Sequence, residues 1–539
     1  MAVTDATTSA AASPAAPLPH QIAEIAAGYA FTGPALEFGA AVLDGAAYPQ
    51  ALVKIPLAVM NRHGLVAGAT GTGKTKTLQL MAEQLVEDGV PVFLADVKGD
   101  LSGIASPGIP NDKITARARD IGMEWQAKGY ATEFYSLGGQ GKGIPVRAAV
   151  SSFGPTLLAK VLGLNATQES SLGLVFHYAD TKQLWLDDIK DLRAVVQHLT
   201  SDEGKADLKD LGGLSAATAG VILRELVNFS AQGADVFFGL PEFDTADLLR
   251  QTADGKGLIS MLELPAVQDR PQLFSTFLMW LLADLYHDLP EVGDLDKPKL
   301  VFFFDEAHLL FHDASKAFLD QIQQTVRLIR SKGVGIFFVT QTPKDVPADV
   351  LAQLGNRVQH ALRAFTPDDA KALKATVSTY PTSGYDLQAL LTQLGIGEAV
   401  ITVLSERGAP TPVAWTRMRA PQSLMAPAPD GLIDATVASS SAAAKYAAAF
   451  DRQSAYEMLT AQAQATAAAA QQAQEQAQQA PAPAPAGEPP APRGRPAREE
   501  PGMFEQVLSN PAVRSMMRSA GSALGREITR SIFGTARRR

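Results

Sequence analysis

The chain of 539 residues contains no cysteine, so disulfide bonds and thiolate metal sites are excluded. It also lacks a basic excess, because 47 Lys and Arg residues stand against 56 Asp and Glu residues and give a net charge of −9. Such a balance is not typical of a nucleic-acid-binding protein. It argues only weakly against one, because an acidic protein can still concentrate its basic residues in a single channel.

A signal peptide and long hydrophobic runs are missing as well. The first 18 residues carry neither a basic stretch nor an apolar one. The most apolar helix candidate, LFSTFLMWLLADLY over 273–286, is interrupted by Asp284 and is too short to span a bilayer. Hydrophobic residues still make up 46% of the chain, enough for a large core. The sequence therefore predicts a soluble, cytoplasmic protein with no integral membrane segment.

Patterning predicts an α/β architecture with a mostly parallel sheet. After a flexible start (1–18) and a short lead-in with strand-like pieces (19–60), residues 61–435 alternate apolar strand runs with helical patterns. That alternation is typical of βαβ units. Within this segment, residues 151–255 hold long helix-period stretches and few strand candidates. We expect them to form a helical insertion in the parallel sheet.

The C-terminal part of the sequence changes in composition. Residues 436–502 are rich in Ala, Gln and Pro and predict a disordered linker. Residues 503–539 carry seven arginines against two glutamates, a local charge of +5, with apolar residues at helical spacing. They predict a basic amphipathic helix that either packs on the folded chain, binds DNA or a partner protein, or contacts an acidic membrane. The long linker favours a tethered binding role.

A phosphate-binding loop is the strongest local signal. The segment GATGTGKT fits the pattern G-x-x-x-x-G-K-[ST] and lies between a predicted strand and a predicted helix. Its glycines let backbone N–H groups point at phosphate oxygens, and the helix N-terminus adds partial positive charge. Lys74 is expected to reach the β- and γ-phosphates, and Thr75 to bind Mg²⁺. The predicted ligands are ATP and Mg²⁺, bound by Gly68, Ala69, Thr70, Gly71, Thr72, Gly73, Lys74 and Thr75.

An acidic pair follows a second apolar strand, in VFFFDEAHLLF over 301–311. Beside a phosphate loop, such a pair is typical of a Walker B site: Asp305 holds the Mg²⁺ shell and Glu306 polarises the attacking water. The alternative is a carboxylate pair that only caps the next helix. The letters Asp-Glu-Ala-His also mark a class of RNA helicases, but the other segments of that class are missing. His308 is therefore interpreted as a helix-start residue.

In this order, the motifs resemble the HerA/FtsK group of P-loop motors, and within it the YjgR-like proteins with a HerA-like helicase domain. The resemblance covers roughly residues 35–430. It implies a P-loop NTPase fold of the RecA-like, additional-strand type and a homohexameric ring that binds ATP between subunits and draws DNA through its centre. The matching segments are NRHGLVAGATGTGKT (61–75), FLADVKGDLSG (93–103), LGLNATQESSLGLVF (162–176), LVFFFDEAHLLF (300–311) and FFVTQTPKDVP (337–347).

The resemblance also implies roles for residues outside the two motifs. Gln341 is expected to be the polar sensor at the end of the strand beside Asp305. Arg330 is expected to be the catalytic arginine that a neighbouring subunit contributes; the alternatives are Arg327, Arg357 and Arg62.

The sequence does not decide the roles of two further residues or the identity of the substrate. Asp96 and Lys98 end the second strand, at the sheet edge where such folds bind ligands, and a direct role for them is an open alternative. HerA itself has a β-barrel ahead of its motor, and a barrel is not expected in the short lead-in here, which speaks against a role in DNA-end resection. Two functions compete: a DNA translocase or helicase, and an ATPase of the same fold that acts on a protein partner or an assembly.

Overall fold

The computed structural model describes residues 17–208, 212–293, 295–311, 314 and 316–479. It divides into two units, 1–468 and 469–539. The second unit is described only over 469–479, the end of helix α17 (Ala455–Gln479). A search of the described helices found none long and apolar enough to cross a membrane.

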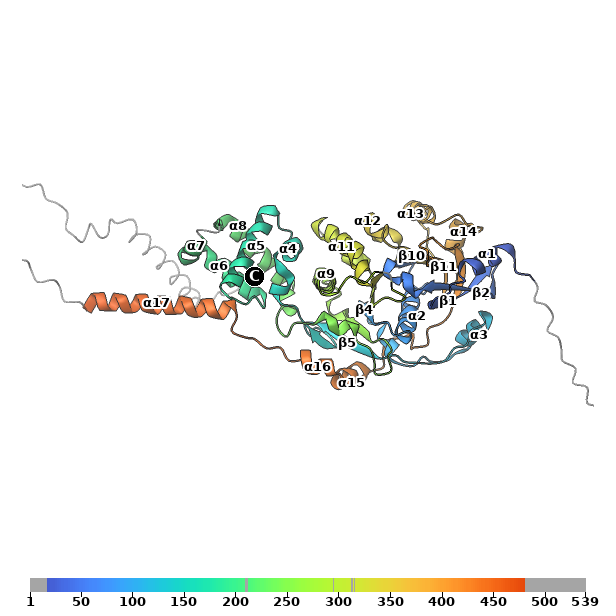
Figure 1. Ribbon diagram of the computed structural model, residues 1–539, viewed down its shortest axis with the longest axis horizontal. Coiled ribbons are helices and arrows are strands. Elements are labelled where there is room, and N and C mark those ends of the chain that lie inside the picture. Colours follow the sequence, from blue (N-terminus) through green and yellow to red (C-terminus); the bar gives the residue numbers. More distant parts are fainter. Residues whose placement is uncertain (1–16, 209–211, 294, 312–313, 315, 480–539) are drawn as a thin grey trace, which may run out of the picture. The chain divides into compact units, whose positions relative to one another are not determined.

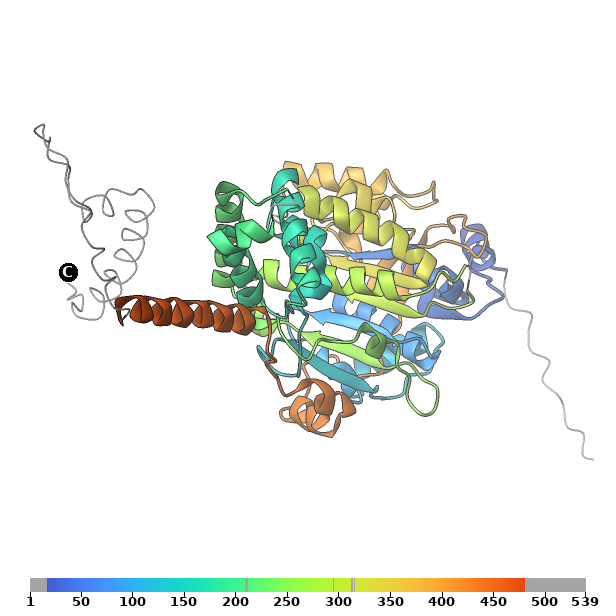
Figure 2. The same ribbon diagram turned by 60° about the vertical axis from the view of Figure 1, so that its left-hand side comes forward.

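One sheet, with twelve strands among the described residues, forms the centre of the first unit (Figures 1 and 2). Its order is β2-β1-β12-β11-β10-β3-β9-β8-β4-β7-β5-β6. All pairs from β10 to β6 are parallel, and the four strands beyond β10 pair antiparallel. The strands are β1 (Ala35–Leu43), β2 (Ala46–Pro56), β3 (Gly64–Ala67), β4 (Val92–Asp96), β5 (Thr132–Leu137), β6 (Ile144–Val146), β7 (Ile259–Glu263), β8 (Leu300–Phe304), β9 (Val334–Thr340), β10 (Asn356–Gln359), β11 (Glu398–Thr402) and β12 (Ala414–Met418).

Helices cover both faces of this sheet, which explains why its central strands are apolar throughout. Along β8, Phe302 and Phe304 join the core that includes α9 and α11, while Val301 and Phe303 join the core that includes α1 and α2. The helices around the sheet are α1 (His20–Gly28), α2 (Lys74–Glu87), α3 (Asp112–Asp120), α9 (Pro271–Asp288), α10 (His308–Phe311), α11 (Lys316–Ile329), α12 (Ala348–Leu351), α13 (Pro367–Val377), α14 (Leu387–Gln393), α15 (Leu432–Ser439) and α16 (Ser441–Tyr446).

The predicted helical insertion lies between β6 and β7 and packs beside the sheet (Figure 1). Its helices are α4 (Val150–Val161), α5 (Ala166–Thr181), α6 (Ile189–Thr200), α7 (Asp202–Asp207) and α8 (Ala216–Ala231). Polar N-caps start four of them, and Asn165 and Asp188 form full capping boxes at α5 and α6. The apolar faces of these helices continue the core that contains α9 and α11.

The structure corrects two domain boundaries and adds two strands. The lead-in is not separate from residues 61–435, because β1 pairs with β12 and extends the same sheet. Strands β6 and β12 were not predicted; β6 has three residues, and β12 alternates buried with half-buried positions. The predicted linker begins too early at 436, because residues 440–459, called here the C-terminal strap, are folded against the insertion. Residues 1–16 of the predicted flexible start (1–18) and the predicted C-terminal helix over 503–539 lie outside the described residues.

Three anchors fix the C-terminal strap, and its Ala-rich composition concealed them. Tyr446 is fully buried. The guanidinium group of Arg452 binds the Asp187 carboxylate through two hydrogen bonds of 2.7 and 2.6 Å. The Ser454 hydroxyl donates to Asp191 Oδ1 at 2.6 Å. Beyond the strap, the Ala/Gln run is helical, as the high helix propensity of alanine favours.

Candidate functional site

The phosphate loop joins β3 to α2 in a conformation that depends on its glycines. Gly71 and Gly73 have φ of 79° and 116°, which side chains rarely adopt. Gly73 is the N-cap of α2, and no side chain caps this helix end. The first turn of α2 carries no acidic residue but two lysines, Lys74 and Lys76. A helix N-terminus without a side-chain cap and with added positive charge favours the binding of an anion.

A buried histidine, His360, contacts the phosphate loop and the first turn of α2. The Nδ1 of His360 donates to the Glu398 carbonyl at 2.9 Å, so its Nε2 accepts the Thr77 hydroxyl at 2.9 Å. A Cβ atom on Gly68 would lie 2.5 Å from the Cβ of His360, so only glycine fits there. Burial lowers the pKa of His360 to about 4 and keeps the ring neutral. The sequence analysis missed this residue; its only signal was a polar side chain within an apolar run.

Lys74 folds back on its own loop. Its Nζ donates to the Ala69 carbonyl at 3.2 Å, and the Thr72 hydroxyl donates to the same oxygen at 2.7 Å. Burial lowers the pKa of Lys74, and the nearby carboxylates Glu306 and Asp305 oppose that shift. The lysine thus stands between the loop and the acidic pair, as the motif predicts. Thr75 is the second residue of α2, on the same helix end.

Asp305 directly follows β8 and is only 5% exposed. Burial raises its pKa to about 7, and the Glu306, Asp96 and Asp100 carboxylates add to the effect. Its Oδ2 has no hydrogen-bond partner within the described part of the chain. Oxygens of Asp96, Asp100 and Asp305 lie within 4.8 Å of one another. A buried carboxylate without a partner in an acidic cluster fits a hard divalent cation such as Mg²⁺.

Glu306 adopts a left-handed backbone conformation, with φ of 47°. Its Oε1 forms an ion pair with Lys98, and its Oε2 lies 3.2 Å from Nδ1 of His308. The interpretation of His308 as a plain helix-start residue was therefore incomplete, because its ring faces the predicted catalytic carboxylate. Lys98, left open by the sequence, lies at the site.

Asp96 shapes the loop that carries Lys98. Its carboxylate accepts the backbone N–H groups of Lys98 at 3.2 Å, Gly99 at 2.7 Å and Leu101 at 2.9 Å. Burial, with the Asp100 charge nearby, raises its pKa to about 6 despite these bonds. Asp96 thus acts mainly on the loop geometry.

Gln341 is the first residue after β9 and is exposed. It lines a cavity of about 490 Å³ together with Ala69 and Thr70, and a second cavity of about 340 Å³ together with His308. It therefore lies between the phosphate loop and the segment that follows the acidic pair. Arg363 also lines the first of these cavities, although the sequence analysis did not single it out.

The four arginine candidates lie at the opposite edge of the sheet. Arg330 precedes β9, and Arg327 is in α11 just before it. Arg62 precedes β3, and Arg357 is the second residue of β10. The phosphate loop follows the other end of β3, so a strand length separates these arginines from the phosphate loop of their own chain, roughly 15 Å. None of the four is placed to complete that site.

An apolar cavity of about 250 Å³ adjoins the first turn of α2. Arg117 of α3 secures its wall, donating to the carbonyls of Gly397 at 2.8 Å and Ile396 at 2.9 Å. Its position beside the phosphate loop suits the base and sugar of a nucleotide. This cavity could not be predicted from the sequence, because its residues come from distant segments. They are Gly73, Lys76, Thr77, Asn111, Lys113, Ile114, Arg117, Ile396, Gly397, Met418, Arg419, Ala420, Pro421 and Met425.

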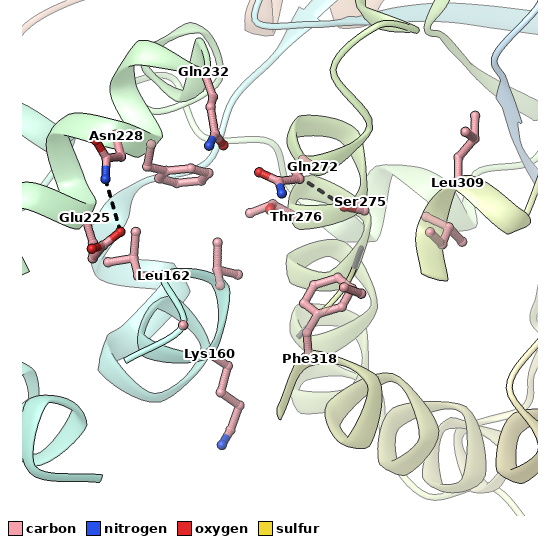
Figure 3. A pocket seen from close by; sticks show the side chains of 15 residues that line it. Lys160, Leu162, Glu225, Asn228, Gln232, Gln272, Ser275, Thr276, Leu309 and Phe318 are labelled. Atoms are coloured by element: carbon pink, nitrogen blue, oxygen red, sulfur yellow. Dashed lines mark hydrogen bonds between the residues drawn. The ribbon is translucent and has the colours of Figure 1, made fainter. Parts of the chain in front are cut away.

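Another cavity, of about 200 Å³, separates the insertion from the helices behind the acidic pair (Figure 3). Leu162 and Asn228 of the insertion lie on one side, and Ser275, Leu309 and Phe318 on the other. Leu309 belongs to α10, which begins two residues after Glu306. The insertion therefore borders the segment that follows the acidic pair.

The chain is similar in sequence to a known protein family. The sequence profile of the family "Helicase HerA-like C-terminal" matches residues 42–539. The chain is 21% identical to the DNA double-strand break repair helicase HerA of Sulfolobus acidocaldarius over 352 residues, and 22% identical to the protein of that name from Sulfurisphaera tokodaii over 358 residues. Each match covers 65% of this chain and spans 64% of the relative's length.

Among solved structures, the bacterial conjugative coupling protein TrwBdeltaN70 is similar to the chain with a TM-score of 0.48 and 15% identity, over 74% of this chain and 97% of that one. The family profile extends over nearly the whole sequence. The chain belongs to the helicase HerA-like C-terminal family.

Proposed function

We propose that the chain is a Mg²⁺-dependent ATPase that works as a ring motor on DNA. One observation carries the ATPase part: the uncapped N-terminus of α2 and Lys74 face a buried carboxylate, Asp305, whose Oδ2 has no partner among the described residues. Anion-binding and cation-binding groups thus meet at one place, which is what a nucleoside triphosphate with its metal ion requires.

The residues divide the work of hydrolysis. Backbone N–H groups of the loop and the Lys74 ammonium bind and orient the phosphates, and Thr75 and Asp305 hold the metal ion. Mg²⁺ bound there supplies positive charge against the phosphate oxygens. Glu306, one residue from Asp305, is placed to orient a water molecule and accept its proton. Gln341, between loop and carboxylate, acts as the sensor of the γ-phosphate.

A ring is proposed because the four arginine candidates cannot reach the phosphate loop of their own chain. They lie at the far edge of the sheet, where they could act only on the site of a neighbour, whereas Arg363 lines the site of its own chain. Arg330, exposed at the end of α11, is the proposed donor, and a homohexamer is the proposed assembly.

DNA is proposed as the substrate because the curated relatives are named as DNA repair helicases. The second candidate is a protein partner or assembly, and the net charge of −9 favours it over DNA. The experiment compares ATPase rates without nucleic acid, with duplex DNA and with single-stranded DNA, alongside the mass of the assembly. A rate that rises with DNA, with binding that weakens steeply as salt is added, supports DNA. Hydrolysis that DNA does not change favours a protein substrate, and a Glu306→Gln variant as active as the wild type would rule out this catalytic site.

A further inference from the structure

The proposed catalytic carboxylate is not free. The Oε1 of Glu306 is paired with the Lys98 ammonium, and the side chain is only 6% exposed. Its Oε2 is buried and faces His308. A carboxylate oxygen held by an ammonium group is not free to bind a water molecule, and the other oxygen of Glu306 faces a histidine ring. In this arrangement Glu306 is restrained from polarising a water molecule.

The two partners of this ion pair differ in their freedom to move. Glu306 is buried, whereas the Lys98 side chain is 48% exposed. The backbone of Lys98 is fixed, because Asp96 accepts its N–H group and that of Gly99. Only the flexible side chain of Lys98 has to swing away for the pair to open, and it opens towards solvent. Because its side chain is half exposed, the Lys98 ammonium can move to another anion, whereas the buried Glu306 carboxylate cannot follow it.

The surroundings indicate the kind of anion. Lys98 lies close enough to Lys74 for their charges to repel, so it lies near the expected phosphate position. The Asp305 and Asp100 carboxylates add to the attraction that Glu306 exerts on Lys98. A phosphate oxyanion meets that need, since it binds lysine as a strong, charge-assisted acceptor.

We propose that Lys98 is a positioning residue that restrains Glu306 in the nucleotide-free state, and that a phosphate oxyanion withdraws it. The phosphate belongs either to the bound nucleotide or to the backbone of a nucleic acid, and the test separates the two. The proposal rests on the proposed ATPase function.

The test measures kcat and KM for ATP in full-length chains carrying Lys98→Met or Lys98→Arg. Lys98→Met is expected to raise the basal kcat about tenfold, which equals roughly 1.4 kcal/mol of barrier, with KM little changed. Lys98→Arg keeps the charge and should stay near the wild-type rate. Lys128→Met is the matched control: that lysine pairs with Glu87, is 38% exposed, and lies outside the site. Its rate should not change.

Two further measurements test whether Lys98 acts through Glu306 and which phosphate releases it. Lys98→Met added to Glu306→Gln should give no increase, because the lysine acts through that carboxylate. If duplex DNA stimulates Lys98→Met less than the wild type, the nucleic-acid backbone is the releasing phosphate; equal stimulation assigns release to the nucleotide. A Lys98→Met rate at or below the wild-type rate, in a protein that binds ATP normally, overturns the restraint. Failure of the ATPase proposal looks different, since wild type and Glu306→Gln would then hydrolyse ATP equally.

Discussion

The parallel strands begin at one edge of the sheet, the amino edge, and end at the other, the carboxyl edge. The two edges differ in how their buried polar groups are hydrogen-bonded. At the amino edge two buried side chains, His63 and Asn356, are paired, whereas Asn61 Oδ1 has no partner within the described residues. His63 Nδ1 accepts the Ile336 N–H at 3.0 Å, and its Nε2 donates to the Val326 carbonyl at 2.7 Å. Asn356 donates to the carbonyl of His63 at 2.9 Å and accepts the N–H of Leu404 at 3.1 Å. These bonds fix the starts of β3, β9 and β10.

At the carboxyl edge, buried carboxylates stand without partners. Asp305 Oδ2, Glu263 Oε1 and Asp100 Oδ1 make no hydrogen bond within the described residues. Burial and the adjacent Asp96, its register partner across β4 and β7, raise the pKa of Glu263 to about 8. The paired edge stabilises the fold, while the unpaired edge costs stability and retains affinity for a ligand.

The comparison predicts the largest effects at the carboxyl edge. Lys74→Ala should abolish nucleotide binding, because Lys74 compensates phosphate charge in the ground state. Glu306→Gln should keep binding and trap ATP, with hydrolysis slower by about 10² to 10⁴-fold, because it acts only on the attacking water. Binding of a fluorescent ATP analogue and phosphate release distinguish the two variants. Equal loss of binding in both would contradict this division of roles.

Arg330→Ala tests whether an arginine at the amino edge of one chain takes part in ATP hydrolysis at the carboxyl edge of a neighbouring chain. The variant should bind ATP but hydrolyse it slower by a factor on the order of 10³, if the arginine acts between subunits. Mixing it with Lys74→Ala subunits should restore part of the activity. At some interfaces, the intact Arg330 of a Lys74→Ala subunit then faces the intact Lys74 of an Arg330→Ala subunit. Joint rings that stay inactive would argue against a shared site. Arg327→Ala tests the alternative candidate in the preceding helix α11, and its rate should not change if Arg330 is the donor.

Stability should respond in opposite directions at the two edges. Asn356→Ala should lower the free energy of unfolding by about 2 to 4 kcal/mol, because it leaves buried backbone groups unpaired. Asp305→Asn should instead raise the stability of the nucleotide-free protein by about 1 to 3 kcal/mol at pH 8, because a buried charge is removed. Thermal midpoints without nucleotide check both. A loss of stability in both variants would remove the distinction between the edges.

Acid should weaken the amino edge through His63. Burial lowers the pKa of His63 from 6.5 to about 4, so between these values the unfolded chain binds a proton and the folded chain does not. Stability is therefore full above about pH 6.5 and is lost as the pH falls towards 4, by on the order of 3 kcal/mol from this residue. His63→Gln should be less stable at pH 8 but show a flatter decline in acid. An equally steep decline would assign the effect to other groups.

The sequence predicted what depends on local pattern. The phosphate loop, the apolar strand before Asp305 and the helical insertion all follow from short-range periodicity, and the structure places them as expected. It could not predict His360, Arg363 or the apolar cavity beside α2, because these arise where segments hundreds of residues apart meet. Composition also misled: Ala-rich sequence after 436 suggested disorder, yet Tyr446 and Arg452 anchor it to the insertion.

The smallest effect on the motor is expected from removing residues 480–539. A cut near residue 438 would remove the C-terminal strap, with Tyr446 and the Arg452–Asp187 pair, and should destabilise the insertion. A chain ending at Gln479 keeps these contacts, so its thermal midpoint and basal ATPase rate should match the full chain. It also loses the seven arginines of 503–539, so its DNA affinity should fall and depend less on salt. Affinity measured over a range of salt concentrations checks this. An unchanged salt slope would mean that the tail makes no electrostatic contact with DNA, and packing on the protein would be the better account.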